Sequence, residues 1–149
     1  MKLTAFTDYS LRVLIYLGAQ PDRRATIAQI AKAFDVSENH LVKVVHHLGK
    51  SGWLANVRGR GGGLELARAP SRINVGHVVR SAEGTAVLAE CFADSGSHCA
   101  IEPCCRLKGV LGEAMSAFYA VLDRYTLADL VKNREQLAGV LFEQGSPHE

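Results

Sequence analysis

Two amphipathic segments separated by only two residues constrain the fold of this chain most. In the first, TIAQIAKAF, Thr26 and Gln29 have the spacing of a capping box at the start of a helix. Asp35-Val36 then leaves room only for a tight turn, and Ser37 is a suitable N-cap for a second helix. The second helix is predicted to turn one apolar stripe inward, made of Leu41, Val44, Val45 and Leu48. Two short helices joined in this way predict a helix-turn-helix.

The segment WLANVRGRGGGLELAR, which follows directly, predicts a β-hairpin. Its strands are expected from Trp53 to Val57 and from Leu64 to Ala67, with Arg58 and Arg60 in the glycine-rich turn between them. A hairpin placed after the second helix is a wing, whose arginines can reach phosphates or a narrow minor groove. The glycines lead into a strand, and no P-loop lysine with Ser or Thr is present, so a nucleotide-binding loop is disfavoured.

The net charge of +2 conceals two halves of opposite sign. Residues 1–80 carry 12 Lys and Arg against 5 Asp and Glu, or +7, whereas residues 81–149 carry 5 against 10, or −5. A basic half of this kind predicts contact with a nucleic-acid backbone. The residues expected to read base edges, near the start of the second helix, are Asn39, His40 and Lys43, with Ser37 touching phosphate.

Helical spacing of apolar residues also marks the two ends of the chain. An early helix is expected from Phe6 to Leu17, and a long one runs for about five turns after Cys104. Thr126 and Asp129 then resemble a fresh cap. Because the long helix outreaches a small winged-helix domain, we expect it to pack against its copy in a two-fold homodimer, which is compatible with packing against residues 1–20.

The fold class expected is therefore mainly α with a small β-hairpin wing, a winged helix-turn-helix domain followed by a long dimerisation helix. Residues 1–82 are expected to form the DNA-binding domain. Residues 83–149 are expected to supply a cysteine loop, the dimerisation helix and a tail, EQGSPHE, without regular structure. The sequence shows no nucleophile–base pair or substrate-binding signature, so an enzyme is not expected.

All four cysteines lie in one stretch, CFADSGSHCAIEPCC, residues 91–105. They could form disulfides, bind a metal or fill a core. The N-terminus lacks the features of a secretory signal, and no apolar run approaches the roughly 18 residues that span a bilayer, so the chain is expected to be cytoplasmic. In that compartment clustered cysteines favour metal binding or redox sensing. Three cysteines with His98 would also suit a zinc ion, although paired C-x-x-C spacing is absent.

Three stretches of the sequence carry a family resemblance. They are MKLTAFTDYSLRVLIYL, VSENHLVKVVHHLGKSGWLANVRGRGGGLELA, and the cysteine loop with FYAVLDRYTLADL after it. In order and spacing they resemble the Rrf2 family of winged-helix transcription regulators, most closely its nitric-oxide-sensing branch. The resemblance implies a homodimeric repressor whose iron–sulfur cluster, 4Fe-4S or alternatively 2Fe-2S, is nitrosylated by nitric oxide, so that a pseudo-palindromic operator is released.

The resemblance also implies the cluster ligands, which match Cys91, Cys99 and Cys105 here. Cys104 is additional and shares a helical face with the apolar residues that follow, so it is expected to begin a buried stripe. Cys105 lies near a helix N-terminus, where the backbone dipole favours a thiolate. For the fourth donor, the resemblance implies Asp8 of the TDY segment, reaching across from the partner chain.

Other regulatory and non-regulatory functions stay open at this point. The sibling branch that senses cluster supply has a histidine three residues after the last cysteine, where this chain has Lys108. An iron-responsive or general redox regulator of the same family is the first alternative. A zinc-stabilised or electron-transfer protein is the second.

Overall fold

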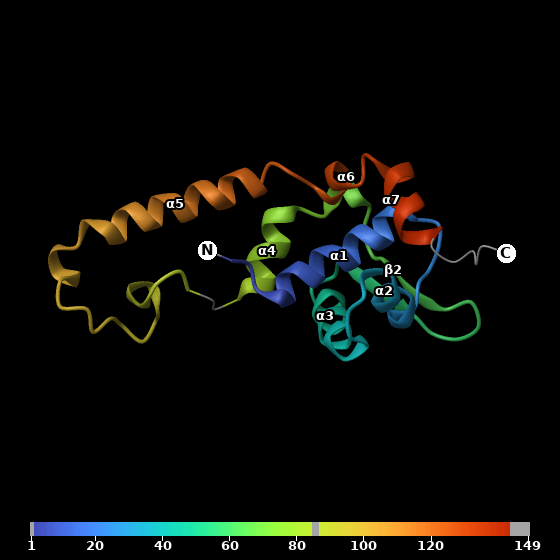
Figure 1. The fold of residues 1–149 in the computed structure, drawn as a ribbon, viewed down its shortest axis with the longest axis horizontal. Helices are drawn as coiled ribbons and strands as arrows, with labels where there is room; N and C mark the ends of the chain where they lie inside the picture. Colours follow the sequence, from blue (N-terminus) through green and yellow to red (C-terminus); the bar gives the residue numbers. More distant parts are fainter. Residues whose placement is uncertain (1, 85–86, 144–149) are drawn as a thin grey trace.

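The structure, a computed structural model, describes residues 2–84 and 87–143 (Figure 1). Its main elements are α1 Ala5–Ala19, α2 Ile27–Phe34, α3 Glu38–Lys50, β1 Leu54–Val57, β2 Gly63–Leu66, α4 Val75–Glu83, α5 Arg106–Leu122, α6 Leu127–Leu130 and α7 Arg134–Phe142. Short 3-10 turns lie at Pro70–Arg72, Glu90–Phe92 and Glu102–Cys104. The expected class, mainly α with one hairpin, is confirmed. Of the expected tail, residues 144–149 lie outside the described residues.

The helix-turn-helix forms as the sequence predicts. The capping box of α2 is present: the Gln29 backbone N–H donates to Thr26 Oγ1 at 3.1 Å, and the Thr26 N–H donates to Gln29 Oε1 at 2.9 Å. Asp35 closes the turn in the left-handed conformation, with φ of 52°. Ser37 is the N-cap residue of α3, although its side chain makes no capping hydrogen bond. The expected stripe of α3 is buried, namely Leu41, Val44, Val45 and Leu48.

The core forms around α1, which runs through the body of the molecule (Figure 1). Val13, Leu14 and Leu17 of α1 are at most 2% exposed and pack with the stripe of α3. The chain returns after α5, so that Leu127 of α6 and Val131 join the same core. Residues far apart in the sequence therefore share one hydrophobic core, and both α3 and the wing pack against it.

The wing is an antiparallel pair in which Leu54 lies opposite Leu66 and Val57 opposite Gly63. A third extended segment joins it through an isolated bridge between Ala25 and Leu64. The predicted strands are confirmed to within one residue.

Helix α5 runs away from this core together with the cysteine loop (Figure 1). None of its 17 residues is buried, and Leu107 and Val110 are each 59% exposed. Burying such side chains removes apolar area from water, so contact with a partner on this face would stabilise the complex.

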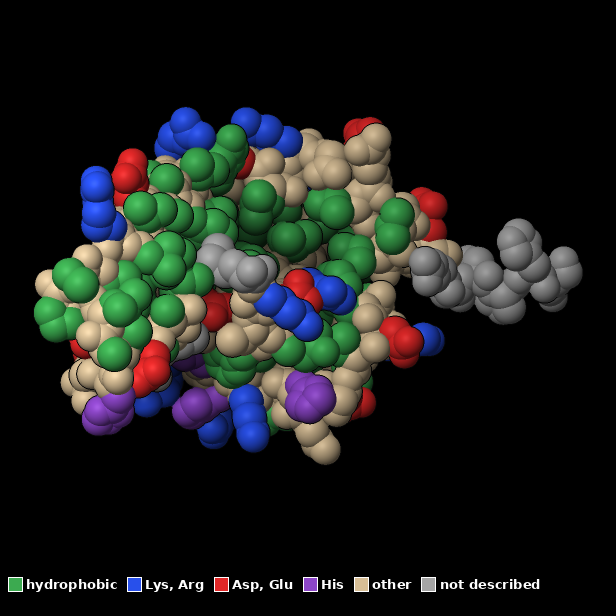
Figure 2. Space-filling model, turned by 60° about the vertical axis from the view of Figure 1, so that its left-hand side comes forward, with side chains coloured by type: hydrophobic (Ala, Val, Ile, Leu, Met, Phe, Trp, Pro, Cys, Tyr) green, Lys and Arg blue, Asp and Glu red, His purple; other side chains and the backbone are tan. Residues whose placement is uncertain are grey.

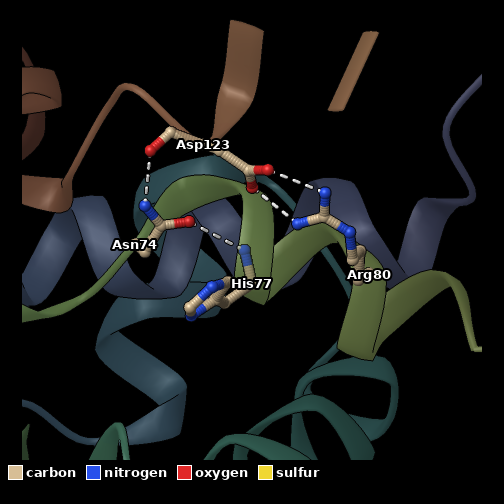
Figure 3. Close-up of polar contacts among 4 residues, drawn as sticks. All are labelled: Asn74, His77, Arg80 and Asp123. Carbon is tan, nitrogen blue, oxygen red and sulfur yellow. Dashed lines mark hydrogen bonds and ion pairs between the residues drawn. The ribbon is translucent and has the colours of Figure 1, made fainter. Parts of the chain in front are cut away.

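The other end of α5 is fastened to α4 by polar contacts (Figure 3). Arg80 pairs with the carboxylate of Asp123, the C-cap residue of α5, with Nη2 donating to Oδ2 at 2.8 Å. This hydrogen bond lowers the pKa of Asp123. Asn74 Nδ2 donates to the Asp123 carbonyl at 2.8 Å, and the Arg80 guanidinium lies 4.4 Å from the centre of the Tyr119 ring. We call these four residues the α4–α5 junction.

Gly76 allows the close approach of the two helices, and its replacement tests the junction. A Cβ atom there would collide with Asp123 Oδ1 and lie 3.0 Å from the Asp123 backbone nitrogen. We therefore expect Gly76→Ala to lower the free energy of unfolding by about 1–3 kcal/mol through overpacking. Thermal unfolding followed by circular dichroism measures this loss.

The matched control for this prediction is Gly49→Ala in α3, where the nearest atom to the new Cβ would be 3.9 Å away. That change should be neutral or stabilising by up to about 1 kcal/mol, because alanine favours helix. Equal midpoints for the two variants would contradict the packing of the junction.

Candidate functional site

The outer face of α3 carries the residues predicted to read DNA. Asn39, His40 and Lys43 are all exposed, close to the helix N-terminus. The His40 ring lies on Tyr9 of α1, with ring centres 6.1 Å apart and an interplanar angle of 22°. The side chain of His40 is therefore oriented by a residue next to Asp8.

His47, which helical spacing places among the outward-facing residues, turns back onto the protein. Its Nε2 lies 3.0 Å from Ser81 Oγ of α4, and its ring meets the Phe6 ring edge-on at 5.3 Å. A neighbour from α4 therefore covers His47, which spacing within α3 cannot show. The contact ties the recognition helix to α1 and α4.

The wing presents Arg58 and Arg60 in an exposed turn. The turn is closed by a hydrogen bond from the Gly62 N–H to the Gly59 carbonyl at 3.0 Å. A Cβ at Gly62 would collide with the Val57 carbonyl, so the turn requires glycine there. The two arginines thus extend from a hairpin of defined shape.

The four cysteines occupy the loop between α4 and α5. Cys91 lies half-buried in the turn Glu90–Phe92, Cys99 is exposed, and Cys105 is the N-cap residue of α5. Cys104 precedes the helix in the turn Glu102–Cys104, and its thiol donates to the Ile101 carbonyl at 3.5 Å. Cys104 therefore lies outside α5, and the expectation that it begins the apolar stripe of this helix is wrong.

The segment from Cys99 to Cys105, here called the cysteine turn, is held by its own backbone and by one ion pair. The Glu102 N–H donates to the Cys99 carbonyl at 3.1 Å, and the Cys105 N–H donates to the Glu102 carbonyl at 3.3 Å. Lys108 of α5 pairs with the Glu102 carboxylate at 3.1 Å. Lys108 therefore fastens the cysteine turn to the first turns of α5.

The donor chemistry of the loop fits an iron–sulfur cluster, although the side chains are not gathered into a site. All four thiols are free of disulfides, and among residues 2–84 and 87–143 no three His, Cys, Asp or Glu side chains lie together as metal ligands would. Thiolates suit iron–sulfur clusters and zinc alike. Cys105 lies at the N-terminus of the 17-residue helix α5. His98 is exposed.

Asp8 lies in the first turn of α1, the helix that also supports α3. Its carboxylate pairs with Arg12 of the same helix, with Nη2 and Oδ2 2.8 Å apart. Both side chains are more than two-fifths exposed, so the pair is weak and the carboxylate remains accessible.

Glu83, which the sequence did not single out, anchors this turn of α1 to the base of the cysteine loop. Its carboxylate accepts hydrogen bonds from the Thr4 N–H at 2.8 Å, the Thr4 hydroxyl at 3.1 Å and the Thr7 hydroxyl at 2.6 Å. Burial raises the pKa of Glu83, but these hydrogen bonds outweigh it, so the pKa lies below its usual value. The only sequence signal is that Thr4 and Thr7 lie one helical turn apart.

Figure 2 brings forward the end of the molecule where α5 and the cysteine loop lie, and hydrophobic side chains are spread across this face. The exposed ones on α5 and just after it include Leu107, Val110, Val121 and Tyr125. Such a continuous exposed apolar surface is typical of a protein interface. No helix of the described residues is both long and apolar enough to cross a membrane.

Comparison with known proteins gives one consistent family. The sequence profile of the Rrf2 family, described as an iron-dependent transcriptional regulator, matches residues 3–133. The HTH-type transcriptional regulator NsrR of Bacillus subtilis is 51% identical over 142 residues, which cover 95% of this chain and 97% of the relative. The protein of the same name from Geobacillus kaustophilus is 49% identical over 145 residues, covering 97% and 99%.

Solved structures agree with this fold. IscR of T. potens superposes with a TM-score of 0.72 at 25% identity, covering all of this chain and 94% of that one. The oxidized form of Staphylococcus aureus CymR gives a TM-score of 0.70 at 25% identity, with 89% and 97% covered.

Glu83→Gln tests whether the anchor on α1 depends on charge. A carboxylate with a lowered pKa in the folded state contributes stability that is present above its unfolded pKa of about 4.3 and lost as the pH falls through the folded value. We expect the free energy of unfolding of the wild type to fall more steeply between about pH 5 and 3 than that of the variant, which keeps an acceptor oxygen. Urea unfolding at several pH values measures both slopes.

The control is Glu135→Gln, which removes an exposed carboxylate from α7. Its pH dependence should follow that of the wild type. Parallel curves for wild type and Glu83→Gln would contradict the stabilising role of the Glu83 carboxylate.

Proposed function

The chain belongs to the Rrf2 family of transcriptional regulators, and we propose that it is a homodimeric repressor that senses nitric oxide through an iron–sulfur cluster. One observation carries the proposal. The cysteine turn leads directly into α5, and the far end of α5 is fastened by the α4–α5 junction to a helix that contacts the recognition helix. A change in the cysteine turn could thus reach the DNA-binding surface through α5, the α4–α5 junction and α4.

DNA binding is assigned to the basic half of the chain. Asn39, His40 and Lys43 would contact base edges in the major groove, while the Ser37 hydroxyl, which makes no cap hydrogen bond, is left to contact a phosphate. Arg58 and Arg60 of the wing would hold the backbone or enter the minor groove. We retain the division at residue 82 as a functional one: residues 1–82 bind DNA, and residues 83–149 sense and dimerise.

The homodimer would form through the exposed apolar face of α5. A two-fold axis crossing this helix would present two copies of α3 to successive major grooves of a pseudo-palindromic operator, about 34 Å apart. The same arrangement would bring Asp8 of one subunit towards the cysteine loop of its partner.

Cys91, Cys99 and Cys105 would bind the cluster, with Asp8 of the partner subunit as the fourth ligand. Cys105 is favoured over Cys104 because it caps α5 directly, whereas the Cys104 thiol is turned to the Ile101 carbonyl. A carboxylate is a hard and weakly held donor beside three soft thiolates, so its position is the one where nitric oxide would enter. A 4Fe-4S cluster suits three cysteines with one oxygen ligand, and 2Fe-2S remains the alternative.

Cys91, Cys99 and Cys105 would hold the cluster, which would supply the centre that reacts with nitric oxide and would keep the three thiolates together. If the three thiolates were no longer held together, the segments that carry them would be the parts of the chain free to change conformation. Cys99 and Cys105 would no longer fix the cysteine turn, so only its backbone hydrogen bonds and the Glu102–Lys108 ion pair would hold it. The start of α5 would then move relative to the junction, and the spacing of the two recognition helices would lose its match to the operator.

An iron-responsive regulator is the second candidate, favoured by the description of the family profile as iron-dependent. The sequence resembles the nitric-oxide-sensing branch, and NsrR is the name of that branch and of the relatives reported above. Lys108, engaged with Glu102 where the sibling branch has a histidine ligand, further favours nitric oxide as the signal.

Single serine substitutions of the four cysteines test the cluster assignment. We expect anaerobically purified wild-type protein to be brown, with about four irons per chain. Cys91→Ser, Cys99→Ser and Cys105→Ser should lose most of the iron and sulfide, and their visible absorption should fall with them. Cys104→Ser is the matched control and should retain both.

Two outcomes contradict the assignment. Loss of the cluster in Cys104→Ser together with its retention in Cys105→Ser would exchange the roles of the two residues. A colourless wild-type protein with stoichiometric zinc would show that the cysteines bind a structural zinc ion instead of a cluster.

A further inference from the structure

Arg24 lies in the extended segment before α2 and reaches across to the wing. Its Nε donates to Glu65 Oε2 of β2 at 2.8 Å, and its Nη1 donates to the Gly61 carbonyl in the wing turn at 3.1 Å. One guanidinium group therefore holds both a strand of the hairpin and its tip. This use of two donors in fixed directions is what distinguishes arginine from lysine.

The backbone reinforces the same contact. The Leu64 N–H donates to the Ala25 carbonyl at 2.7 Å, and the Ala25 N–H donates to the Leu64 carbonyl at 3.1 Å. Gly63 has φ of 140°, and a Cβ there would lie 3.0 Å from the Ala25 carbonyl oxygen. Since Thr26 caps α2 in the next position, the segment joins the wing to the start of the helix-turn-helix.

The charge of Glu65 is unusual for its place. It is the one acidic residue between Glu38 and Glu83 in the sequence. A carboxylate on the wing, near Arg58 and Arg60, opposes the approach of DNA phosphates. Because Arg24 and Glu65 are 40% and 36% exposed, their pair contributes little to overall stability. The pair joins the wing to the segment that leads into the helix-turn-helix.

We propose that Arg24 and Glu65 form a brace that positions the wing for DNA, so that Arg58 and Arg60 reach the backbone while α3 lies in the major groove. The proposal rests on the proposed DNA-binding function and deepens it. A duplex has a fixed distance between these two contacts, and a wing free to move would lose conformational entropy when it binds. Arg24 and Glu65 are thus positioning residues rather than DNA contacts.

Glu65→Gln gives the decisive measurement. On charge alone, removal of an acidic group from the wing should tighten DNA binding, whereas loss of the brace should weaken it. The probe is a fluorescently labelled duplex that the wild-type protein has selected from a random-sequence pool. Binding to it is measured by fluorescence anisotropy at KCl concentrations from about 50 to 200 mM. We expect Glu65→Gln and Arg24→Ala each to raise Kd about fivefold, with the salt dependence of the wild type.

Arg58→Ala and Arg60→Ala are the matched comparison. Each should also weaken binding, but each should reduce the slope of log K against log salt by about one, because a phosphate contact is lost. Arg24→Lys should restore binding in part, since a lysine can pair with Glu65 without also holding the Gly61 carbonyl.

Trypsin supplies a readout that needs no DNA. Arg58 and Arg60 are themselves cleavage sites in the wing turn, so a loosened wing should be cut faster there. We expect faster cleavage after these residues in Arg24→Ala and Glu65→Gln, with the thermal midpoint of the wild type.

Three results would decide against the brace or separate it from the proposed function. Equal or tighter DNA binding by Glu65→Gln, with wing cleavage unchanged, overturns the brace. A salt slope reduced by about one in Arg24→Ala, again with unchanged cleavage, overturns it in favour of a direct phosphate contact. A wild type that selects no duplex overturns the proposed function, and trypsin cleavage alone then decides on the brace.

Discussion

Burial of α1 is the constraint on which the other parts of the structure depend. Val13, Leu14 and Leu17 are almost completely buried, and each such side chain contributes about 1.5–3 kcal/mol when removed from water. The recognition helix, α4 and the returning helices α6 and α7 all pack against this one helix. Near its N-terminus α1 also carries Asp8 and Tyr9, so a proposed cluster ligand and a residue that stacks on His40 of the recognition helix are neighbours on the same helix.

Two polar connections link this core to the sensing half. Glu83 ties the end of α4, from which the cysteine loop departs, to Thr4 and Thr7 of α1. At the opposite end of the loop and helix, Arg80 and Asp123 tie α5 back to α4. The cysteine loop and α5 are therefore held at both ends while their middle stays outside the core. Such an arrangement suits a segment whose conformation depends on what binds within it.

The parts that the sequence predicts correctly are those set by local rules. Capping at Thr26 and Thr126, the stripe of α3 and the two strands of the wing follow from spacing over a few residues. The missed features join residues far apart in sequence, such as His47 with Ser81 and Thr7 with Glu83. Hydrophobic periodicity carries no information on polar partners of this kind. Cys104 fell outside the helix because a 3-10 turn ends there and α5 begins two residues later.

Of the candidate site, the sequence predicted the exposed polar face of α3 and the cysteine loop, but not the contacts that would couple them. The lone acid Glu65 in a basic stretch was a usable signal, since an unfavourable charge in a binding surface calls for a structural reason. The proposed convergence of Cys91, Cys99 and Cys105 would depend on a bound group as well as on the chain, so neither helical spacing nor turn chemistry could determine it.

The central claim is that nitric oxide, acting on the cluster, changes DNA binding through the cysteine turn. The most direct measurement adds nitric oxide to the cluster-loaded protein on its selected duplex, and follows visible absorption and DNA anisotropy in the same cuvette, with an iron chelator in a parallel sample. We expect absorption and anisotropy to fall together with nitric oxide, well before the chelator releases the duplex. Bleaching by nitric oxide with the DNA complex unchanged would contradict the claim.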